Sequence, residues 1–373
     1  MAVQCLARYR RGTAMALDRI SLSDFRNHAA TGLDGTARFN LLVGENGAGK
    51  TNVLEALSLL APGRGLRRAA LADVVRSGAD NGFAVGADLL SRDEPLRIGT
   101  YSDSASPGRR RVRINGAETS AVALGEWLAA SWLTPAMDGL FMDAAGARRR
   151  YMDRLAVAID PAHASMASRF DAALRERNRL LSGDRAPDPA WMDALEAQLA
   201  QYGSALSQGR ARLVETLMVH LAAMPAEPFA RPALTHIPGG PLDEGALAQS
   251  LYDGRSRDRA AQRTLTGPHR DELDVIHHAK RQPAALSSTG EQKAMLVAIT
   301  LAHAAMAAQG RASLLLLDEV AAHLDPVRRA ALFEQLAASG AQVWMTGTEV
   351  GPFGSLVEEA AVWRVSGGAA EPL

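Results

Sequence analysis

The stretch GENGAGKTNVLEA, residues 44–56, matches the phosphate-loop pattern G-x-x-x-x-G-K-T. Glycines in this pattern let backbone N–H groups face phosphate oxygens, and the helix that follows adds its positive N-terminus. We expect Lys50 to reach the β- and γ-phosphates of a nucleoside triphosphate and Thr51 to ligate Mg²⁺. The apolar run RFNLLVG before the loop predicts a buried strand, and KTNVLEALSLLA after it has helical spacing. The predicted loop comprises Gly44, Glu45, Asn46, Gly47, Ala48, Gly49, Lys50 and Thr51.

The composition fits a globular protein, and we expect a cytoplasmic one. The chain has 373 residues, 47% of them hydrophobic and 22% charged, which is enough for two or three domains. It contains no apolar run long enough to cross a bilayer, and the first residues lack the apolar region of a signal peptide. Residues 1–14 show no pattern and are predicted to be a disordered leader or to precede a true start at Met15. The formal charge is zero, so any nucleic-acid site must be a local patch.

A second predicted element of the phosphate site is SLLLLDE, residues 313–319. Its four leucines predict a central strand, and Asp318 and Glu319 follow at the carboxyl end, where ligands bind in open α/β sheets. We expect Asp318 to hold Mg²⁺ through water, and Glu319 to be the general base that orients and deprotonates the attacking water. Two solvated acids at a strand end would give the same pattern, so the assignment depends on the phosphate loop.

Lys50 and Asp318 lie much farther apart along the chain than a compact NTPase core requires, which predicts an inserted domain. Apolar residues at three- and four-residue steps within 146–224 predict an antiparallel helix pair, and residues 225–241 read as a proline-rich connector. The predicted fold class is α/β, an ABC-type P-loop ATPase head with a mixed sheet lobe, a signature-helix lobe and an inserted all-helical lid. The predicted boundaries are 15–134 for the first half of the head, 135–262 for the lid and 263–373 for the second half.

A third element, SSTGEQKAMLVAITLA, begins at residue 287. Ser288, Gly290 and Gln292 resemble the LSGGQ-type signature at a helix N-terminus, where a hydroxyl, a small backbone and a helix dipole suit a γ-phosphate. In ABC-type heads that phosphate belongs to the partner subunit, so we expect an ATP-dependent homodimer. The segment DEVAAHLD continues as the D-loop, with Asp325 near the dimer seam. An ordinary helix N-cap is the alternative for Ser288.

Seven motifs together resemble the RecF family of bacterial recombination mediators over residues 17–348. They occur in family order: LSDFRNH, GENGAGKTNVLEAL, ARRRYMDRL, GPHRDEL, STGEQK, LLLLDEVAAHLD and QVWMTGT. The resemblance implies a head that dimerises on ATP, binds DNA at single-strand gaps or junctions, and cooperates with RecR and RecO to load RecA, with SOS induction following. Arg26 and Asn27, just after the first strand, resemble residues that contact the nucleotide in related heads, with solvation at the strand end as the alternative. His269 and Arg270 of GPHRDEL receive no predicted role.

Two departures from transporter-type heads predict slow turnover. The strand AQVWMTGT ends in Thr346, Gly347 and Thr348, where those heads place a histidine, and the segment SWLTPAMDGLF offers no Q-loop glutamine. We therefore expect weak ATP hydrolysis that acts as a timer. As a separate expectation, DNA stimulates this hydrolysis.

Three arginine clusters are candidates for DNA contact, because phosphate contacts supply most nonspecific affinity. Solvated surface faces are the alternative for each cluster, and Arg67 is also a candidate for coupling DNA to the nucleotide. The candidates are Arg64, Arg67, Arg68, Arg110, Arg111, Arg148 and Arg149.

Two other functions remain open from the sequence. The ATPase subunit of a membrane transporter is disfavoured by the missing histidine, the helical insertion and GPHRDEL. A non-hydrolysing structural protein of chromosomes is disfavoured because the chain lacks long heptad arms.

Overall fold

The structure is a computed structural model that describes residues 16–373 apart from 91–95, 186, 226, 308–309 and 322–323. The predicted leader, residues 1–14, lies outside the described residues. Packing divides the chain into two compact units. The first unit comprises the described residues up to Asp138, together with Glu227–Phe229 and Leu296–Leu373, and the second comprises Gly139–Ala226 and Ala230–Met295.

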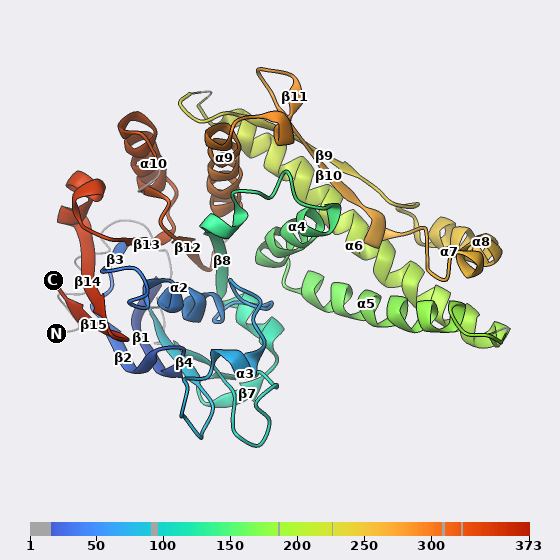
Figure 1. Cartoon of the computed structure of the whole chain (residues 1–373), viewed down its shortest axis with the longest axis horizontal. Helices are drawn as coiled ribbons and strands as arrows, with labels where there is room; N and C mark the ends of the chain where they lie inside the picture. The colour runs from blue at the N-terminus through green and yellow to red at the C-terminus, as the bar shows by residue number, and fades with distance from the viewer. Residues whose placement is uncertain (1–15, 91–95, 186, 226, 308–309, 322–323) are drawn as a thin grey trace. The chain divides into compact units, whose positions relative to one another are not determined.

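A mainly parallel sheet of six strands, in the order β15-β14-β3-β13-β12-β8, runs through the first unit (Figure 1). Its strands are β3 (Phe39–Val43), β8 (Leu128–Leu133), β12 (Ala312–Leu317), β13 (Gln342–Gly347), β14 (Ala360–Ser366) and β15 (Ala369–Pro372). Every residue of β3, β8, β12 and β13 is buried, as expected for parallel strands covered on both faces. The strands predicted from RFNLLVG, SLLLLDE and AQVWMTGT are confirmed, whereas β14 and β15 were not predicted.

A second sheet of the first unit has the strand order β2-β1-β4-β5-β6-β7, with antiparallel neighbours throughout. Its strands are β1 (Ala16–Phe25), β2 (His28–Asp34), β4 (Ala84–Leu90), β5 (Leu96–Tyr101), β6 (Arg111–Ile114) and β7 (Ala117–Thr119). The buried side chain of Gln342 connects the two sheets, because its amide exchanges hydrogen bonds with the backbone N–H and C=O of Leu17. The two sheets also share one apolar core, because a single cluster of buried hydrophobic side chains includes residues from both.

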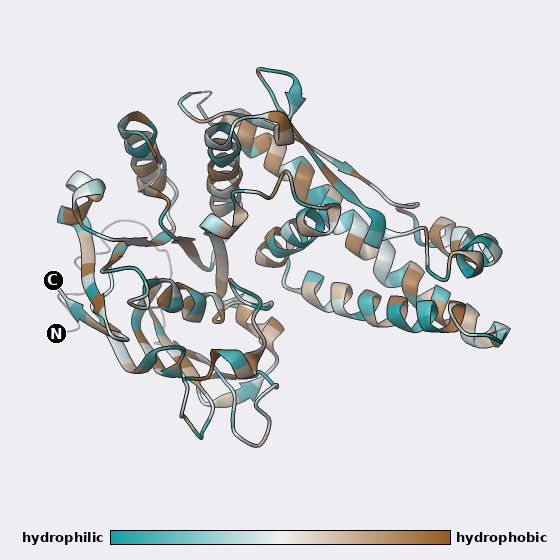
Figure 2. Cartoon of the chain, in the orientation of Figure 1, coloured by the Kyte–Doolittle hydropathy of each residue, from teal (hydrophilic) through white to brown (hydrophobic). Residues whose placement is uncertain are grey.

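Helices complete the first unit. They are α2 (Lys50–Ser58), α3 (Leu71–Val74) and α10 (Pro326–Ala338), with the 3-10 turns η1 (Ala121–Glu126), η2 (Pro135–Met137) and η6 (Gly351–Glu359). The predicted apolar stripe of α2 is confirmed, since Val53 and Leu57 are fully buried, as is Leu60 just after the helix. Helix α9 (Thr289–Ala307) contributes residues to both units. Hydrophobic residues, brown in Figure 2, are frequent along it.

The second unit is built on an antiparallel pair, α5 (Ala162–Leu181) and α6 (Pro189–Ala223), which confirms the predicted helix pair (Figure 1). Phe170 on α5 packs with Leu199 and Leu206 of α6 in a core of its own. The remaining helices are α4 (Ala145–Ile159), α7 (Glu244–Asp253) and α8 (Arg255–Ala260). Among the described residues no helix is both long and apolar enough to span a membrane.

The expectation that the insertion is entirely helical is wrong in one respect. The connector contains the strand β9 (Pro232–Ile237), which pairs antiparallel with β10 (Glu272–His277), and β10 pairs with β11 (Gln282–Pro283). Pro232 begins this strand and Pro238 follows it, and prolines argue against a strand assignment. The alternating burial of β9 also depends on a partner strand that is distant in sequence. Packing also groups 263–295 with the helices, while the predicted division at 262 stays a prediction.

Candidate nucleotide-binding site

The phosphate loop joins the carboxyl end of β3 to the N-terminus of α2. Gly44 has a φ of 156°, and a Cβ there would lie 2.2 Å from the carbonyl oxygen of Val365 on the neighbouring strand. Gly49 precedes α2 with a φ of 115°, and the first turn of that helix contains no acidic residue to neutralise its positive end. Glu45, Asn46 and Gly47 are exposed. The loop therefore offers a small, open backbone before a helix N-terminus, which fits a bound anion.

Two side chains from the LSDFRNH motif contact the backbone of the phosphate loop. Asn27 Nδ2 donates to the carbonyl oxygen of Ala48 at 2.9 Å, and Asn27 Oδ1 accepts from Asn52 Nδ2 at 2.8 Å. His28 is fully buried, with its ring Nε2 3.1 Å from the carbonyl oxygen of Gly49, and burial lowers its pKa. Sequence reasoning missed His28, although its place beside Asn27 in the motif was a signal. Both residues hold the loop's shape.

Lys50 is only 4% exposed, and its ammonium lies over the loop that precedes it. Lys50 Nζ donates to the carbonyl oxygens of Gly44 at 2.6 Å and Glu45 at 2.8 Å. Burial lowers the pKa of Lys50, while the charges of Glu319 and Asp318 act to raise it. The predicted cation is thus inside the loop, with both predicted acids of β12 close enough to influence it.

The residues predicted to hold Mg²⁺ are in direct contact. Thr51 Oγ1 donates to Asp318, at 2.9 Å from Oδ1 and 3.1 Å from Oδ2. Thr346, at the end of β13, donates to Asp318 Oδ1 at 2.8 Å and accepts from the backbone N–H of Glu319 at 2.8 Å. Since β13 lies between β3 and β12, Thr346 links the two halves of the site. These neighbouring oxygens suit a hard cation such as Mg²⁺.

Glu319, the predicted base, has a φ of 53°, which is uncommon for a residue with a Cβ. The bond from its backbone N–H to Thr346 fixes this conformation. The sequence pointed to the end of AQVWMTGT without assigning a role, and the structure gives Thr346 one.

An arginine pair holds the outer face of α2. Glu55 is 2% exposed and accepts from Arg26, at 2.9 Å from Nε and 2.8 Å from Nη2. Arg67 Nη1 donates to Glu55 at 2.8 Å and to Asn52 Oδ1 at 2.7 Å. Arg26 and Arg67 therefore lie against the helix that begins at Lys50, and the predicted nucleotide contact of Arg26 stays a prediction.

In the second unit, Ser288 caps α9. Its Oγ accepts from the backbone N–H of Glu291 at 3.4 Å, and its own N–H donates to Glu291 Oε2 at 3.0 Å. This reciprocal pattern is a capping box, so the alternative considered for Ser288 is present. Ser288 and Gly290 are exposed, whereas Gln292 is 1% exposed and donates to the carbonyl oxygen of Ser287 at 2.9 Å. The Gln292 side chain thus anchors the preceding turn.

Asp325 caps α10 in the first unit. Its Oδ1 accepts from the backbone N–H of Arg328 at 2.9 Å, and that bond lowers the pKa of Asp325. The carboxylate is exposed, as a residue at a dimer seam would be.

Comparison with known proteins decides the family. The family described as "RecF/RecN/SMC N terminal domain" matches residues 16–350. The chain is 47% identical to "DNA replication and repair protein RecF" of Mesorhizobium japonicum over 370 residues, 95% of this chain and 97% of that protein. It is also 47% identical to the protein of the same name from Rhizobium rhizogenes over 365 residues, 94% and 97% of the two chains. The chain belongs to the RecF family.

Solved structures agree with the predicted fold class. The "recombination mediator protein RecF-ATPrS in RecFOR pathway" matches with a TM-score of 0.84 and 21% identity, over 96% of this chain and 98% of that chain. The Smc head domain from Pyrococcus furiosus matches with a TM-score of 0.54 and 15% identity, over 96% of each chain. Identities this low establish the fold alone, and that fold is the ABC/SMC-type head of the RecF family.

The RecF-family motif GPHRDEL organises the second unit through its acidic residues. Asp271 is fully buried and its Oδ2 accepts from Ser207 Oγ at 2.8 Å and from Arg210 Nη1 at 2.9 Å. His236 Nε2 lies 2.9 Å from the same oxygen, and the backbone N–H of Gly239 donates to Oδ1 at 2.8 Å. Burial alone would raise the pKa of Asp271, but the bonds from His236 and Gly239 hold it below its usual range. Sequence reasoning named the two residues before Asp271 and missed this one.

His269 and Arg270 of the same motif have smaller parts. His269 Nε2 lies 2.9 Å from the carbonyl oxygen of Thr264, its ring stacks on Phe170 at 6.1 Å, and burial lowers its pKa. Arg270 is exposed. The motif is therefore a structural element of the second unit in this RecF-family chain.

Several arginines proposed for DNA already have protein partners. Arg110 donates to Thr100 Oγ1 at 2.9 Å and to the carbonyl oxygens of Leu59, Ala61 and Gly63, just after α2. Burial lowers the pKa of Arg110 to about 10. These bonds satisfy carbonyl groups beyond a helix C-terminus, so the guanidinium has little left to offer DNA.

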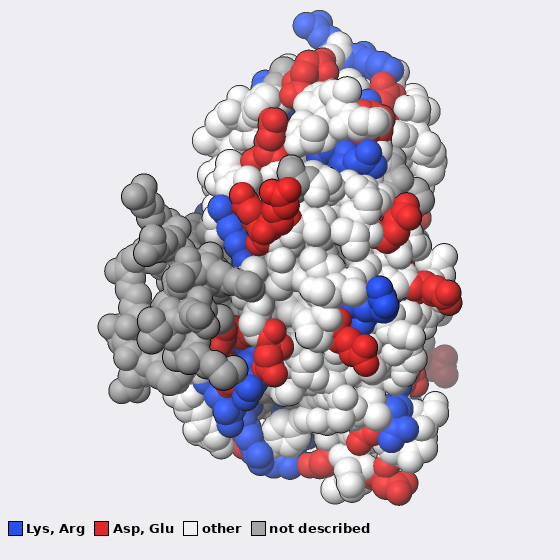
Figure 3. Space-filling view, turned by 90° about the vertical axis from the view of Figure 1, so that its left-hand side faces the viewer, with Lys and Arg blue, Asp and Glu red and all other residues white. Residues whose placement is uncertain are grey.

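The other clusters also contain both arginines that bond to protein groups and arginines that are exposed. Arg148 makes a bidentate pair with Glu272 at 2.7 and 2.8 Å, and Arg149 donates to the carbonyl oxygen of Asp271 at 2.8 Å. Arg111 is shared between Asp103 and Glu118 at 2.7 Å each. Arg64 and Arg68 are exposed on the segment after α2 and stay DNA candidates. On the face drawn in Figure 3, basic and acidic side chains are interspersed outside the grey residues.

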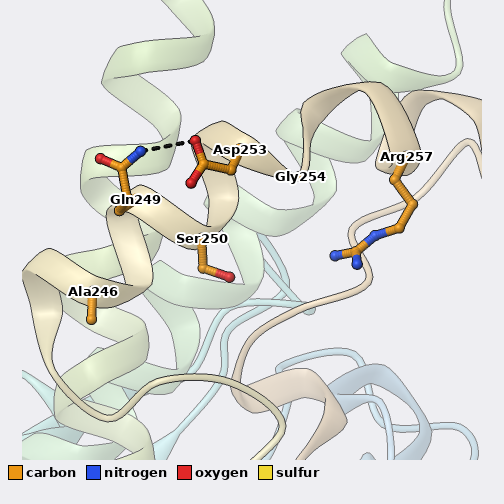
Figure 4. Close-up of a pocket in the computed structure, with 6 residues that line it drawn as sticks. All are labelled: Ala246, Gln249, Ser250, Asp253, Gly254 and Arg257. Carbon is orange, nitrogen blue, oxygen red and sulfur yellow. Dashed lines mark hydrogen bonds between the residues drawn. The ribbon is translucent and has the colours of Figure 1, made fainter.

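A hollow of about 670 Å³ lies on α7 and the turn into α8 (Figure 4). Gln249 Nε2 donates to Asp253 Oδ1 on the same helix at 2.9 Å. Its lining consists of Ala246, Gln249, Ser250, Asp253, Gly254 and Arg257. None of the predicted site residues lines it.

Proposed function

We propose that this chain is an ATP-gated DNA-binding protein of recombinational repair and replication, in which slow hydrolysis resets a dimer. The observation that carries the proposal is the contact of Thr51, Asp318 and Thr346 beside the phosphate loop. The relatives' description as DNA replication and repair proteins, and the ATP analogue named with the matching RecF structure, support it.

The residues divide the work of hydrolysis among themselves. The backbone of the phosphate loop and Lys50 would bind the triphosphate, and Thr51 and Asp318 would hold Mg²⁺, which supplies charge neutralisation on the phosphate oxygens. Glu319 would orient water and accept its proton. Thr346 fixes the backbone of Glu319 and the carboxylate of Asp318. Without a histidine at this strand end, turnover is slow.

The proposed active state is a homodimer. Ser288 and Gly290 of one subunit would meet the γ-phosphate held by the other, with Asp325 near the seam. The support is that Ser288, Gly290 and Asp325 are all exposed in the single chain, as residues that meet a partner subunit would be. The dimer would bind single-stranded or gapped DNA in the cytoplasm, with RecR and RecO as partners, help to load RecA, and so promote SOS induction.

Light scattering with and without Mg²⁺-ATP, and with gapped DNA added, tests the proposal. We expect ATP to convert monomer to dimer, and Glu319→Gln to retain the dimer while losing hydrolysis. Lys50→Met should abolish dimerisation together with ATP binding, whereas Ser288→Arg should block dimerisation and keep ATP binding. A monomer under every condition would contradict the proposed clamp.

A further inference from the structure

Both hydrogen-bond donors of Ser288 are occupied by one carboxylate. The backbone N–H and the hydroxyl of Ser288 each lie 3.0 Å from Glu291 Oε2. A capping box requires the bond from the Glu291 backbone to Ser288 Oγ and one return bond. Here Glu291 Oε2 also accepts a hydrogen bond from the Ser288 hydroxyl. Glu291 therefore occupies the donors that the proposed function assigns to the partner's γ-phosphate.

A lysine holds the other oxygen of that carboxylate. Lys280, in the turn between β10 and β11, places its Nζ 2.5 Å from Glu291 Oε1, and His277 Nε2 lies 3.8 Å from the same atom. Bonds from Lys280 and from the Ser288 N–H lower the pKa of Glu291 to about 2, so the carboxylate is an anion at neutral pH. The Lys280 side chain is 50% exposed and the Glu291 side chain 20%, so the ion pair lies at the surface of the chain.

An incoming phosphate and the Glu291 carboxylate cannot share the donors of Ser288, because both are anions and each needs the same two hydrogens. Phosphate binding therefore requires the Glu291 carboxylate to leave Ser288. Lys280 already bonds Glu291 Oε1, so it can keep hold of the carboxylate when Oε2 leaves Ser288. An ammonium suits this task, since it is a compact charge with three rotatable donors on a flexible stem.

We propose that Glu291 is a displaceable anion that occupies the phosphate donors of Ser288, and that Lys280 is the positioning residue that receives its carboxylate when the partner's nucleotide arrives. This pair would set how much ATP-bound protein is needed for dimerisation. The inference rests on the proposed function, because it assumes that Ser288 meets a γ-phosphate across the dimer.

The test measures the dimer dissociation constant by sedimentation in Mg²⁺-ATP, with every chain carrying Glu319→Gln to prevent hydrolysis. Glu291→Gln keeps the shape of the cap and removes the charge, so the dimer should tighten about fivefold, the scale of one unit-charge repulsion at 4 Å in water. Lys280→Gln should weaken the dimer by a similar factor, and Lys280→Arg should restore it. Arg281→Gln, which removes the neighbouring exposed charge of the same turn, is the matched control and should change nothing.

Two further readouts separate positioning from simple support of the fold. The ATP affinity of the dilute monomer should stay unchanged in Glu291→Gln, and its melting temperature should fall only slightly, as expected for the loss of one surface ion pair. In the double variant Lys280→Gln with Glu291→Gln, the loss from Lys280 should vanish, because Lys280 acts only through Glu291.

The contrary results are distinct. A dimer left unchanged by Glu291→Gln but weakened by Glu291→Ala would make Glu291 a helix cap only, and additive effects in the double variant would place Lys280 directly on the phosphate. Either result overturns the inference and leaves the proposed dimer standing. Unimpaired dimerisation of Ser288→Arg would instead overturn the proposed function, and the inference with it.

Discussion

Replacing Asp271 by asparagine tests whether GPHRDEL holds the second unit together. The Asp271 side chain is fully buried and its two oxygens accept from Ser207, Arg210, His236 and the backbone of Gly239. Asparagine keeps the shape but has one oxygen and one NH₂ group. In either orientation the NH₂ group faces a donor, and Arg210 loses one of its two anionic partners.

The expected loss is set by the buried ion pair. Removing one partner of such a pair costs about 3–5 kcal/mol, because the other charge stays buried without compensation. Arg210 keeps a bidentate pair with Asp153, at 2.8 and 2.9 Å, so the lower end of this range applies. We expect the unit's free energy of opening to fall by about 3 kcal/mol, which is roughly a hundredfold increase in the open population at 1.4 kcal/mol per factor of ten.

Hydrogen exchange followed by mass spectrometry on peptides from α6 measures this opening in the intact chain. Amides of α6 should exchange roughly a hundredfold faster in Asp271→Asn than in the unsubstituted protein. The matched control is Glu215→Gln on the exposed face of the same helix, where a change within about 0.5 kcal/mol is expected. Exchange in Asp271→Asn within threefold of the control would refute the reasoning, since Asp271 would then not be the acceptor that fixes the unit.

Three shorter predictions address the rest of the chain. Arg110→Met should lower the stability of the first unit by about 2 kcal/mol in urea titrations, because buried carbonyls after α2 lose their donor, while DNA affinity in the folded variant stays unchanged. Thr346→Val should leave ATP binding intact and reduce steady-state Mg²⁺-dependent hydrolysis about 10- to 100-fold, as expected for a residue that orients a metal ligand. At low pH, protonation of the Asp153 carboxylate should destabilise the second unit. Burial would raise its pKa, but the bond from His163 and the charge of Arg210 lower it to about 2. The folded pKa lies below the unfolded value, so about 2 kcal/mol present above pH ~4 is lost as pH falls towards ~2, measurable by unfolding at stepped pH.

The parts of the fold that could be predicted are those encoded within one short segment. A buried strand followed by glycines and a helix defines the phosphate loop, and a leucine run followed by Asp318 and Glu319 defines its partner strand. Strand β9 was missed because its alternating pattern is short, is bounded by prolines, and depends on pairing with β10 far along the chain. The strands β14 and β15 follow the last recognised motif, so no neighbouring signal marked them.

The candidate site shows the same limit at the level of side chains. Residue type predicted that Thr51 and Asp318 share a site, but the part of Thr346 depends on β13 lying between β3 and β12, which only the sheet order reveals. Asn27 was expected at the nucleotide from resemblance, and in the structure its amide supports the loop at Ala48. The supporting layer of the site could not be predicted because its contacts join segments with no common pattern.

The arginine clusters could not be assigned from the sequence, for an electrostatic reason. The chain has 41 basic and 41 acidic residues, so carboxylates are available within the fold to pair with guanidinium groups. Arg148 and Arg111 do so, and each would have to give up a charge-assisted bond before it could bind a phosphate. Arg64 is exposed, and no ion pair is found for it among the described residues. In this chain a cluster of arginines in the sequence is therefore compatible with internal ion pairs as well as with DNA contacts, and the partners of each side chain in the fold are needed to tell the two apart.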